Sequence, residues 1–168
     1  LAAHDDVKII GLVLRLSNGF GAPAHRDVNC WALLVNDLCR QAVTKRSLTL
    51  RSSGVQRRDF VTLHDLGMAF SHFLDVSRDK AGDGVFNVGG SWAPRVLEMA
   101  ETIQERCSVV LGFVPEIIRP EPTGKEPGQN LDYRIDRLLA SGFTLSGNAS
   151  AEIDATLLVC RDVFSGVS

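Results

Sequence analysis

Residues 7–16 read VKIIGLVLRL, and this stretch decides the fold. Valine, isoleucine and leucine lie on both faces of this expected strand. A strand with one solvent-exposed face instead has polar residues at every second position. A run that is apolar on both sides is typical of a central strand in a parallel sheet covered on two faces. The following residues 18–23, NGFGAP, predict a loop because they contain two glycines and a proline.

Short β-rich runs and segments of helical periodicity alternate beyond this strand. In residues 29–45 apolar side chains recur at intervals of three and four, and Asp27 or Asn29 can cap this helix. Asp65 is expected to cap a second helix with a core face of Leu66, Ala69, Phe70, Phe73 and Leu74. The remaining pattern predicts strands over 48–50, 60–63, 85–88 and 116–119, helices from Pro94, over 132–141 and over 153–164, and a loop over 120–130. This alternation predicts an α/β fold.

Composition and charge exclude several classes of partner. The chain has 168 residues with 18 basic and 20 acidic side chains, so its net charge of −2 gives no broad electrostatic footprint for nucleic acid or anionic lipid. Its longest near-continuous apolar stretch, residues 9–14, is far shorter than the roughly 20 residues of a membrane-spanning helix. We therefore expect a globular chain of single-domain length that has neither a nucleic-acid nor a membrane partner.

The four cysteines indicate a reducing environment and no metal site. They form no C-x-x-C pair and have no metal-like spacing with any histidine. Three of them fall on the apolar faces of expected helices, which favours buried, reduced thiols in a cytoplasmic protein.

The residues alone offer no catalytic constellation and two candidates for ligand binding. The chain contains no nucleophile elbow, P-loop or G-x-G-x-x-G, and His64 beside Asp65 is best explained by a helix start. Asn18 lies just past the carboxyl end of the first strand, where ligands bind in open α/β sheets, although a turn-forming role is the alternative. Arg58 carries a guanidinium that matches phosphate oxygens, although a solvated ion pair with Asp59 is the alternative.

Four segments resemble motifs of one enzyme family. Residues 14–23 (LRLSNGFGAP) are similar to its "LR-x-x-N-x-x-G-P" segment, and residues 54–66 (GVQRRDFVTLHDL) to its "G-x-x-x-RDF-V-x-V-x-D-L" signature. Residues 85–90 (VFNVGG) resemble its "V-(Y/F)-N-V-G" strand, and residues 132–143 (DYRIDRLLASGF) its helix ending in "LGF". The family is that of the NAD-dependent sugar-nucleotide epimerases and dehydratases, which are extended short-chain dehydrogenases.

This resemblance covers the carboxyl-terminal half of the family. It implies the last strands of a Rossmann-type parallel sheet, with residues 1–28 a residual piece of the dinucleotide-binding domain. Residues 29–168 would then form the smaller α/β substrate domain with C-terminal helices. The Gly-rich cofactor loop and the Y-x-x-x-K pair of the N-terminal half are expected upstream of Leu1, with residues 1–4 the tail of the lysine-bearing helix.

For function, the resemblance implies oxidoreductase-type chemistry on a nucleotide-sugar in the parent enzyme, with NAD or NADP as cofactor. No catalytic residue is expected in this chain. The chain alone should bind no cofactor and should have no oxidoreductase activity. Whether the parent reaction is epimerisation, dehydration or reduction stays open. The alternatives are a non-catalytic module that binds a nucleotide or sugar, and an interaction domain.

The resemblance also assigns roles to individual residues. It implies that Asn18 contacts the substrate phosphate or sugar and that Arg58 clamps the diphosphate. The backbone at Leu16 and Ser17 would face the nicotinamide carboxamide, and Leu48 and Leu50 would line the nucleoside base.

One departure from the family pattern concerns the second phosphate-binding arginine. Many members place it just before a "(P/E)-G-D" turn, but the matching segment here, residues 125–129, reads KEPGQ. Lys125 is the expected substitute, as a point charge without the bidentate geometry of arginine.

The first strand also predicts association between copies. If residues 7–16 lack neighbouring strands, they expose a hydrogen-bonding edge and apolar surface. We therefore expect a homo-oligomer or a strand-exchanged dimer.

Overall fold

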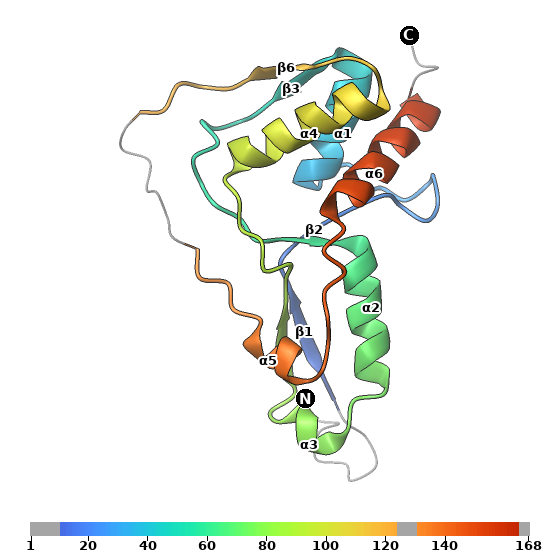
Figure 1. The fold of residues 1–168 in the computed structure, drawn as a ribbon, viewed down its shortest axis with the longest axis vertical. Coiled ribbons are helices and arrows are strands. Elements are labelled where there is room, and N and C mark those ends of the chain that lie inside the picture. Colours follow the sequence, from blue (N-terminus) through green and yellow to red (C-terminus); the bar gives the residue numbers. More distant parts are fainter. Residues whose placement is uncertain (1–10, 124–130, 165–168) are drawn as a thin grey trace.

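The computed structural model describes residues 11–123 and 131–164, and it has an α/β architecture of short parallel strand pairs and helices (Figure 1). Strand β1 (Val13–Leu16) pairs with β5 (Val85–Val88), β2 (Asn18–Phe20) with β4 (Phe60–Thr62), and β3 (Ser47–Thr49) with β6 (Glu116–Ile118), all in parallel. The α/β class predicted by the alternating pattern is confirmed.

One core lies around the first strand pair. Helix α2 (Leu63–Leu74) packs over β2 and β4, and the short helices α3 (Arg78–Ala81) and α5 (Asp136–Ala140) lie in the same half of the molecule (Figure 1). The buried side chains of this core include Val61, Ala69, Phe73, Phe86, Val88 and Leu138. Since β5 pairs with β1, residues 85–88 continue the sheet that begins in the range 1–28.

A second core lies among three helices in the other half of the molecule. Helices α1 (Leu34–Lys45), α4 (Val96–Val110) and α6 (Ala149–Phe164) pack against one another beside β3 and β6 (Figure 1). Their shared buried side chains include Leu38, Leu48, Met99, Ile103, Ile153 and Leu157. The periodic apolar faces predicted for these helices are the faces that meet.

The cysteines are buried, as their positions on apolar helix faces predict. All four cysteines are buried free thiols. None of the helices described is long and apolar enough to cross a membrane.

The structure corrects the expected core face of α2. Leu66, Ala69 and Phe73 are buried as predicted, but Phe70 is 52% and Leu74 86% exposed. Leu66, Ala69 and Phe73 form the stripe that covers the underlying strands, and Phe70 and Leu74 lie along the edge of this stripe, where they are largely exposed.

Helix boundaries also differ from the sequence expectation. The first helix begins at Leu34 rather than near residue 29, and Trp31 lies in the turn before it. Thr62, not Asp65, is the N-cap of α2: its hydroxyl accepts from the Asp65 N–H at 2.9 Å and donates to Asp65 Oδ2 at 2.9 Å. Asp65 also accepts from the Ser146 N–H at 2.8 Å, which ties α2 to the segment before α6.

Strand β1 is shorter and less covered than expected. It begins at Val13, and residues 7–10 of the predicted strand lie outside the described residues. Val13 and Leu16 are exposed, so the described residues cover its two faces only in part.

Candidate functional site

A cleft of about 480 Å³ gathers three of the residues singled out in the sequence. Asn18 is the first residue of β2, Leu50 follows β3, and Arg58 precedes β4. They are separated along the chain, so only the fold brings them to one surface. The opposite wall is residues 31–40, which lead into and form the first turns of α1.

Asn18 is held by the strand beside it. Its backbone N–H and its side-chain Nδ2 both donate to the Asp59 carbonyl, at 3.2 and 2.9 Å. These bonds fix the amide at the carboxyl end of β1 and leave its side-chain oxygen, an acceptor, for a ligand. The residue therefore lies in a strand pair and not in the tight turn that was its alternative role.

Arg58 is exposed at the cleft, and the ion pair with Asp59 that was its alternative role is not formed. Asp59 is 2% exposed, points away from the cleft and accepts from the Gly90 N–H at 3.0 Å. Adjacent residues of an extended chain point to opposite sides, so the two side chains diverge. Within residues 11–123 and 131–164, no carboxylate lies at ion-pair distance from Arg58.

The neighbouring Arg57 shows how an arginine is used structurally in the same segment. Its guanidinium donates to the Ala93 carbonyl at 2.8 Å and lies 3.9 Å from the Glu98 carboxylate. The two arginines therefore differ: one anchors the segment to α4, and the other is open to the cleft.

Asp59 is a buried carboxylate beneath the cleft. Burial raises its pKa, while the nearby Ser17 hydroxyl and the backbone N–H groups of Gly90 and Trp92 lower it. The Ser17 oxygen is buried beside this carboxylate, but within the described part of the chain it meets hydrogen-bond geometry with no group.

The other predicted site residues that the structure describes do not line the cleft. Leu48 is fully buried in the core, opposite Ile117 in the β3–β6 pair. It does not line the cleft, whereas Leu50, two residues further along the chain, does. Leu16 and Ser17 lie at the end of β1 and do not line the cleft. Lys125 lies outside the described residues.

Sequence reasoning missed several charged residues that line the same cleft: Asp37, Arg40 and Arg51. Arg51 directly follows the alternating run at 48–50, and a charged residue at a strand end was the available signal. Asp37 and Arg40 of α1 gave no local signal, because a charged side chain on a helix usually lies on the solvent-exposed face.

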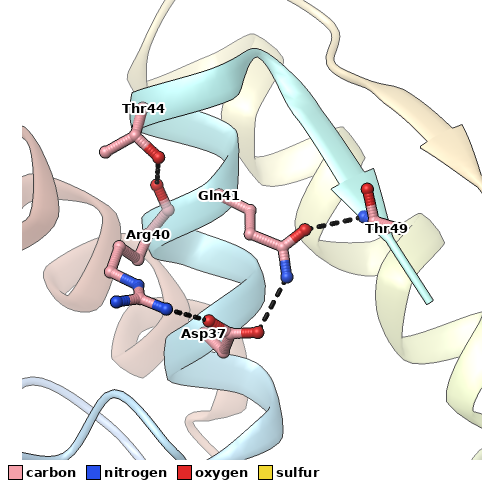
Figure 2. Close-up of polar contacts among 5 residues, drawn as sticks. All are labelled: Asp37, Arg40, Gln41, Thr44 and Thr49. Carbon is pink, nitrogen blue, oxygen red and sulfur yellow. Dashed lines mark hydrogen bonds and ion pairs between the residues drawn. The ribbon is translucent and has the colours of Figure 1, made fainter. Parts of the chain in front are cut away.

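Figure 2 shows how α1 holds the end of β3. The Gln41 side chain accepts from the Thr49 N–H at 2.8 Å and donates to Asp37 Oδ2 at 2.7 Å. Arg40 donates to the other Asp37 oxygen at 2.5 Å. Both carboxylate oxygens of Asp37 are therefore occupied by neighbours on its own helix.

The described residues contain no cluster of three or more metal-ligating side chains. The cleft combines guanidinium groups, an amide and apolar side chains, which is a set suited to a ligand with both anionic and apolar parts.

Comparisons with known proteins agree with the family resemblance, and the matched region contains the first two motifs and nearly all of the third. Residues 1–89 match the profile of the NAD dependent epimerase/dehydratase family. A search of curated proteins gave no match.

Solved structures of similar fold include three sugar-nucleotide enzymes. UDP-N-acetylglucosamine 4-epimerase from Methanobrevibacter ruminantium, in complex with UDP-N-acetylmuramic acid, is 18% identical with a TM-score of 0.69, and 99% of this chain covers 50% of that one. UDP-glucuronic acid 4-epimerase from Bacillus cereus, in complex with UDP-glucuronic acid and NAD, is 18% identical with a TM-score of 0.66 and coverages of 96% and 48%. dTDP-glucose 4,6-dehydratase from Bacillus anthracis, in complex with NAD, is 16% identical with a TM-score of 0.68 and coverages of 98% and 48%.

The TM-scores show a shared fold, and the chain spans about half the length of each of these structures.

Proposed function

Because the chain belongs to the NAD-dependent epimerase/dehydratase family, we propose that its cleft holds the nucleoside diphosphate part of a sugar nucleotide. One observation carries this proposal: Asn18, Leu50 and Arg58 converge on one cleft, and Arg58 has no carboxylate partner among the described residues. The volume of about 480 Å³ lies within the roughly 300–1,000 Å³ of small-molecule sites.

Each residue supplies a different contact. Arg58 presents a planar fork to two phosphate oxygens, and charge-assisted bonds of this kind are the strong ones. The Asn18 oxygen accepts from a sugar hydroxyl, and Leu50 lies against the nucleoside. Lys125 remains a proposed additional charge on the diphosphate, and Leu48 supports the base site through its main chain.

The parent activity that this binding serves is oxidoreductase-type epimerisation or dehydration of the sugar. Similar structures hold NAD, which when bound accepts and returns a hydride. The residues at the end of β1 fit its nicotinamide: Leu16 is exposed there, and the Ser17 hydroxyl is a buried oxygen that meets hydrogen-bond geometry with no group of the described residues. In this proposal Leu16 and Ser17 orient the carboxamide, and the chain supplies no catalytic residue of its own.

Titration of the 168-residue chain with UDP tests the binding site. Replacing Arg58 by alanine removes a charge-assisted contact of about 1.5–3 kcal/mol, so we expect the Kd to rise by roughly 10- to 100-fold. Arg161→Ala is the matched control, because Arg161 pairs with the adjacent Asp162 on α6 and does not line the cleft. Equal affinities of the two variants, or no UDP binding by the folded chain, would overturn the proposal.

We also propose that copies of the chain associate. Among the described residues β1 pairs only with β5, so its other edge is open. Phe70 and Leu74 are exposed one turn apart on α2, and such apolar surface favours burial against another chain. Sedimentation over a wide range of concentration is expected to show a homo-oligomer, and a monomer throughout would contradict this.

The buried free thiols support a cytoplasmic location for the protein, since disulfides persist mainly in oxidising compartments.

A further inference from the structure

The cleft has more positive than negative side chains. Arg40, Arg51 and Arg58 line it, against one carboxylate, Asp37. The balance between these four groups decides what the cleft can hold, because an unpaired guanidinium is a binding group only if nothing in the fold already occupies it.

Asp37 is fully engaged within α1. Arg40 and Gln41 each donate to one of its oxygens, at 2.5 and 2.7 Å (Figure 2). Asp37 thereby pairs with Arg40, and two arginines remain without a carboxylate partner in the described part of the chain: Arg51 and Arg58.

The main chain that leads to Arg51 is fixed on two sides. The Thr49 N–H donates to Gln41 Oε1 at 2.8 Å, which bonds this strand end to α1. The next residue, Leu50, donates its N–H to the Ile118 carbonyl at 2.8 Å, which continues the β3–β6 pairing. Arg51 therefore projects from an anchored strand end, and only its side chain has to become ordered when it binds a ligand.

From these observations we infer that Arg51 is a second anion-binding residue of the cleft, through which the site distinguishes nucleoside diphosphates from monophosphates. This rests on the proposed function, in which Arg58 binds phosphate. One guanidinium satisfies a single phosphate, so the second contributes only when the ligand carries a further phosphate group. Arg51 thus supplies a second guanidinium fork to the diphosphate site.

The test compares UDP with UMP as ligands of the 168-residue chain, by calorimetric titration of the wild type and of Arg51→Ala. We expect the variant to bind UDP roughly tenfold more weakly, the effect of one charge-assisted contact, while its affinity for UMP stays within about twofold. The preference for UDP should therefore fall by the same factor. Arg161→Ala should leave both affinities and their ratio unchanged.

Two further variants separate the possible failures. Arg58→Ala should weaken the binding of both UDP and UMP, because Arg58 binds the phosphate that the two ligands share. If Arg58→Ala weakens binding while Arg51→Ala keeps the wild-type preference for UDP, the inference about Arg51 is wrong and the proposed function stands. If the folded wild type binds neither nucleotide, both are wrong.

Gln41→Ala tests the anchoring of the strand end. This variant keeps the Arg51 guanidinium but frees the Thr49 N–H, so we expect a smaller loss of UDP preference than in Arg51→Ala. A Gln41→Ala chain whose unfolding midpoint falls while its UDP preference is that of the wild type would show that the anchor serves stability alone.

Discussion

The side-chain amide of Asn36 is hydrogen-bonded in both directions to the backbone of Gly21. Its Nδ2 donates to the Gly21 carbonyl at 2.8 Å, and its Oδ1 accepts from the Gly21 N–H at 3.1 Å. Asn36 is fully buried, so these bonds join α1 to the chain just after β2 without access for water. The first turns of α1 and the start of β2 both line the cleft. The two hydrogen bonds between Asn36 and Gly21 fix these two walls of the cleft relative to each other.

Replacing Asn36 by alanine is expected to lower the free energy of unfolding by about 2–3 kcal/mol, because it leaves the Gly21 N–H and carbonyl buried without partners. Urea denaturation measures this change. Asn29→Ala is the control: Asn29 is exposed, so its replacement should change stability by less than about 0.5 kcal/mol. Equal stability of the two variants would show that the Gly21 groups find other partners.

Two glycines should respond to alanine in opposite directions. A Cβ on Gly90 would overlap the Phe60 carbonyl oxygen, so Gly90→Ala must push β4 aside and should destabilise the chain by about 2–4 kcal/mol. Gly67 lies within α2 with open space around its Cα, so Gly67→Ala should stabilise it by about 0.5–1 kcal/mol. Thermal or urea unfolding of both variants measures the contrast, and a stable Gly90→Ala chain would contradict the close approach.

The buried Asp59 carboxyl should make stability depend on pH. Burial raises its pKa in the folded state, so the folded chain retains a proton that the unfolded chain has released. Its contribution to stability is therefore full below the unfolded pKa of about 3.9 and is lost as the pH rises through the folded pKa. Asp59→Asn keeps an oxygen for the Gly90 N–H but does not titrate.

We expect the stability of the wild type to fall relative to that of Asp59→Asn as the pH rises above about 4. The quantity to measure is the difference between the two unfolding free energies across this range. Glu152, whose pKa burial also raises, is common to both chains and cancels from that difference. A wild type that gains stability over the variant with rising pH would contradict the sign.

The elements with strong local periodicity were predictable, and the cleft was predictable only in part. The apolar face through Leu38 and Ala42 in α1, and the strand 85–88, follow from patterns within a few residues. Asn18 and Arg58 were candidates from the residues alone, but only the family motifs favoured ligand binding over their structural alternatives, since nothing local shows that they meet in one cleft.

Apart from the helix boundaries and caps, the main corrections concern contacts that the local sequence does not show. Asp59 is buried because it bonds to Gly90 rather than to its neighbour Arg58, and local sequence does not show that contact. The exposure of Phe70 depends on what lies over α2, which the periodicity of the helix cannot specify. Arg51 was overlooked because its importance depends on Asp37 being occupied by other residues of α1.

The parallel strand pairs also have a consequence for how the chain folds. Val13 pairs with Val85, Asn18 with Phe60 and Ser47 with Glu116, so in the described structure every pair closes a loop of tens of residues. The helices can form within their own segments, but these pairs form only after the entropy of loop closure has been overcome, which makes folding slow. During that delay the unpaired strands of neighbouring molecules compete with the correct partner, so the refolding yield should decrease as the protein concentration increases.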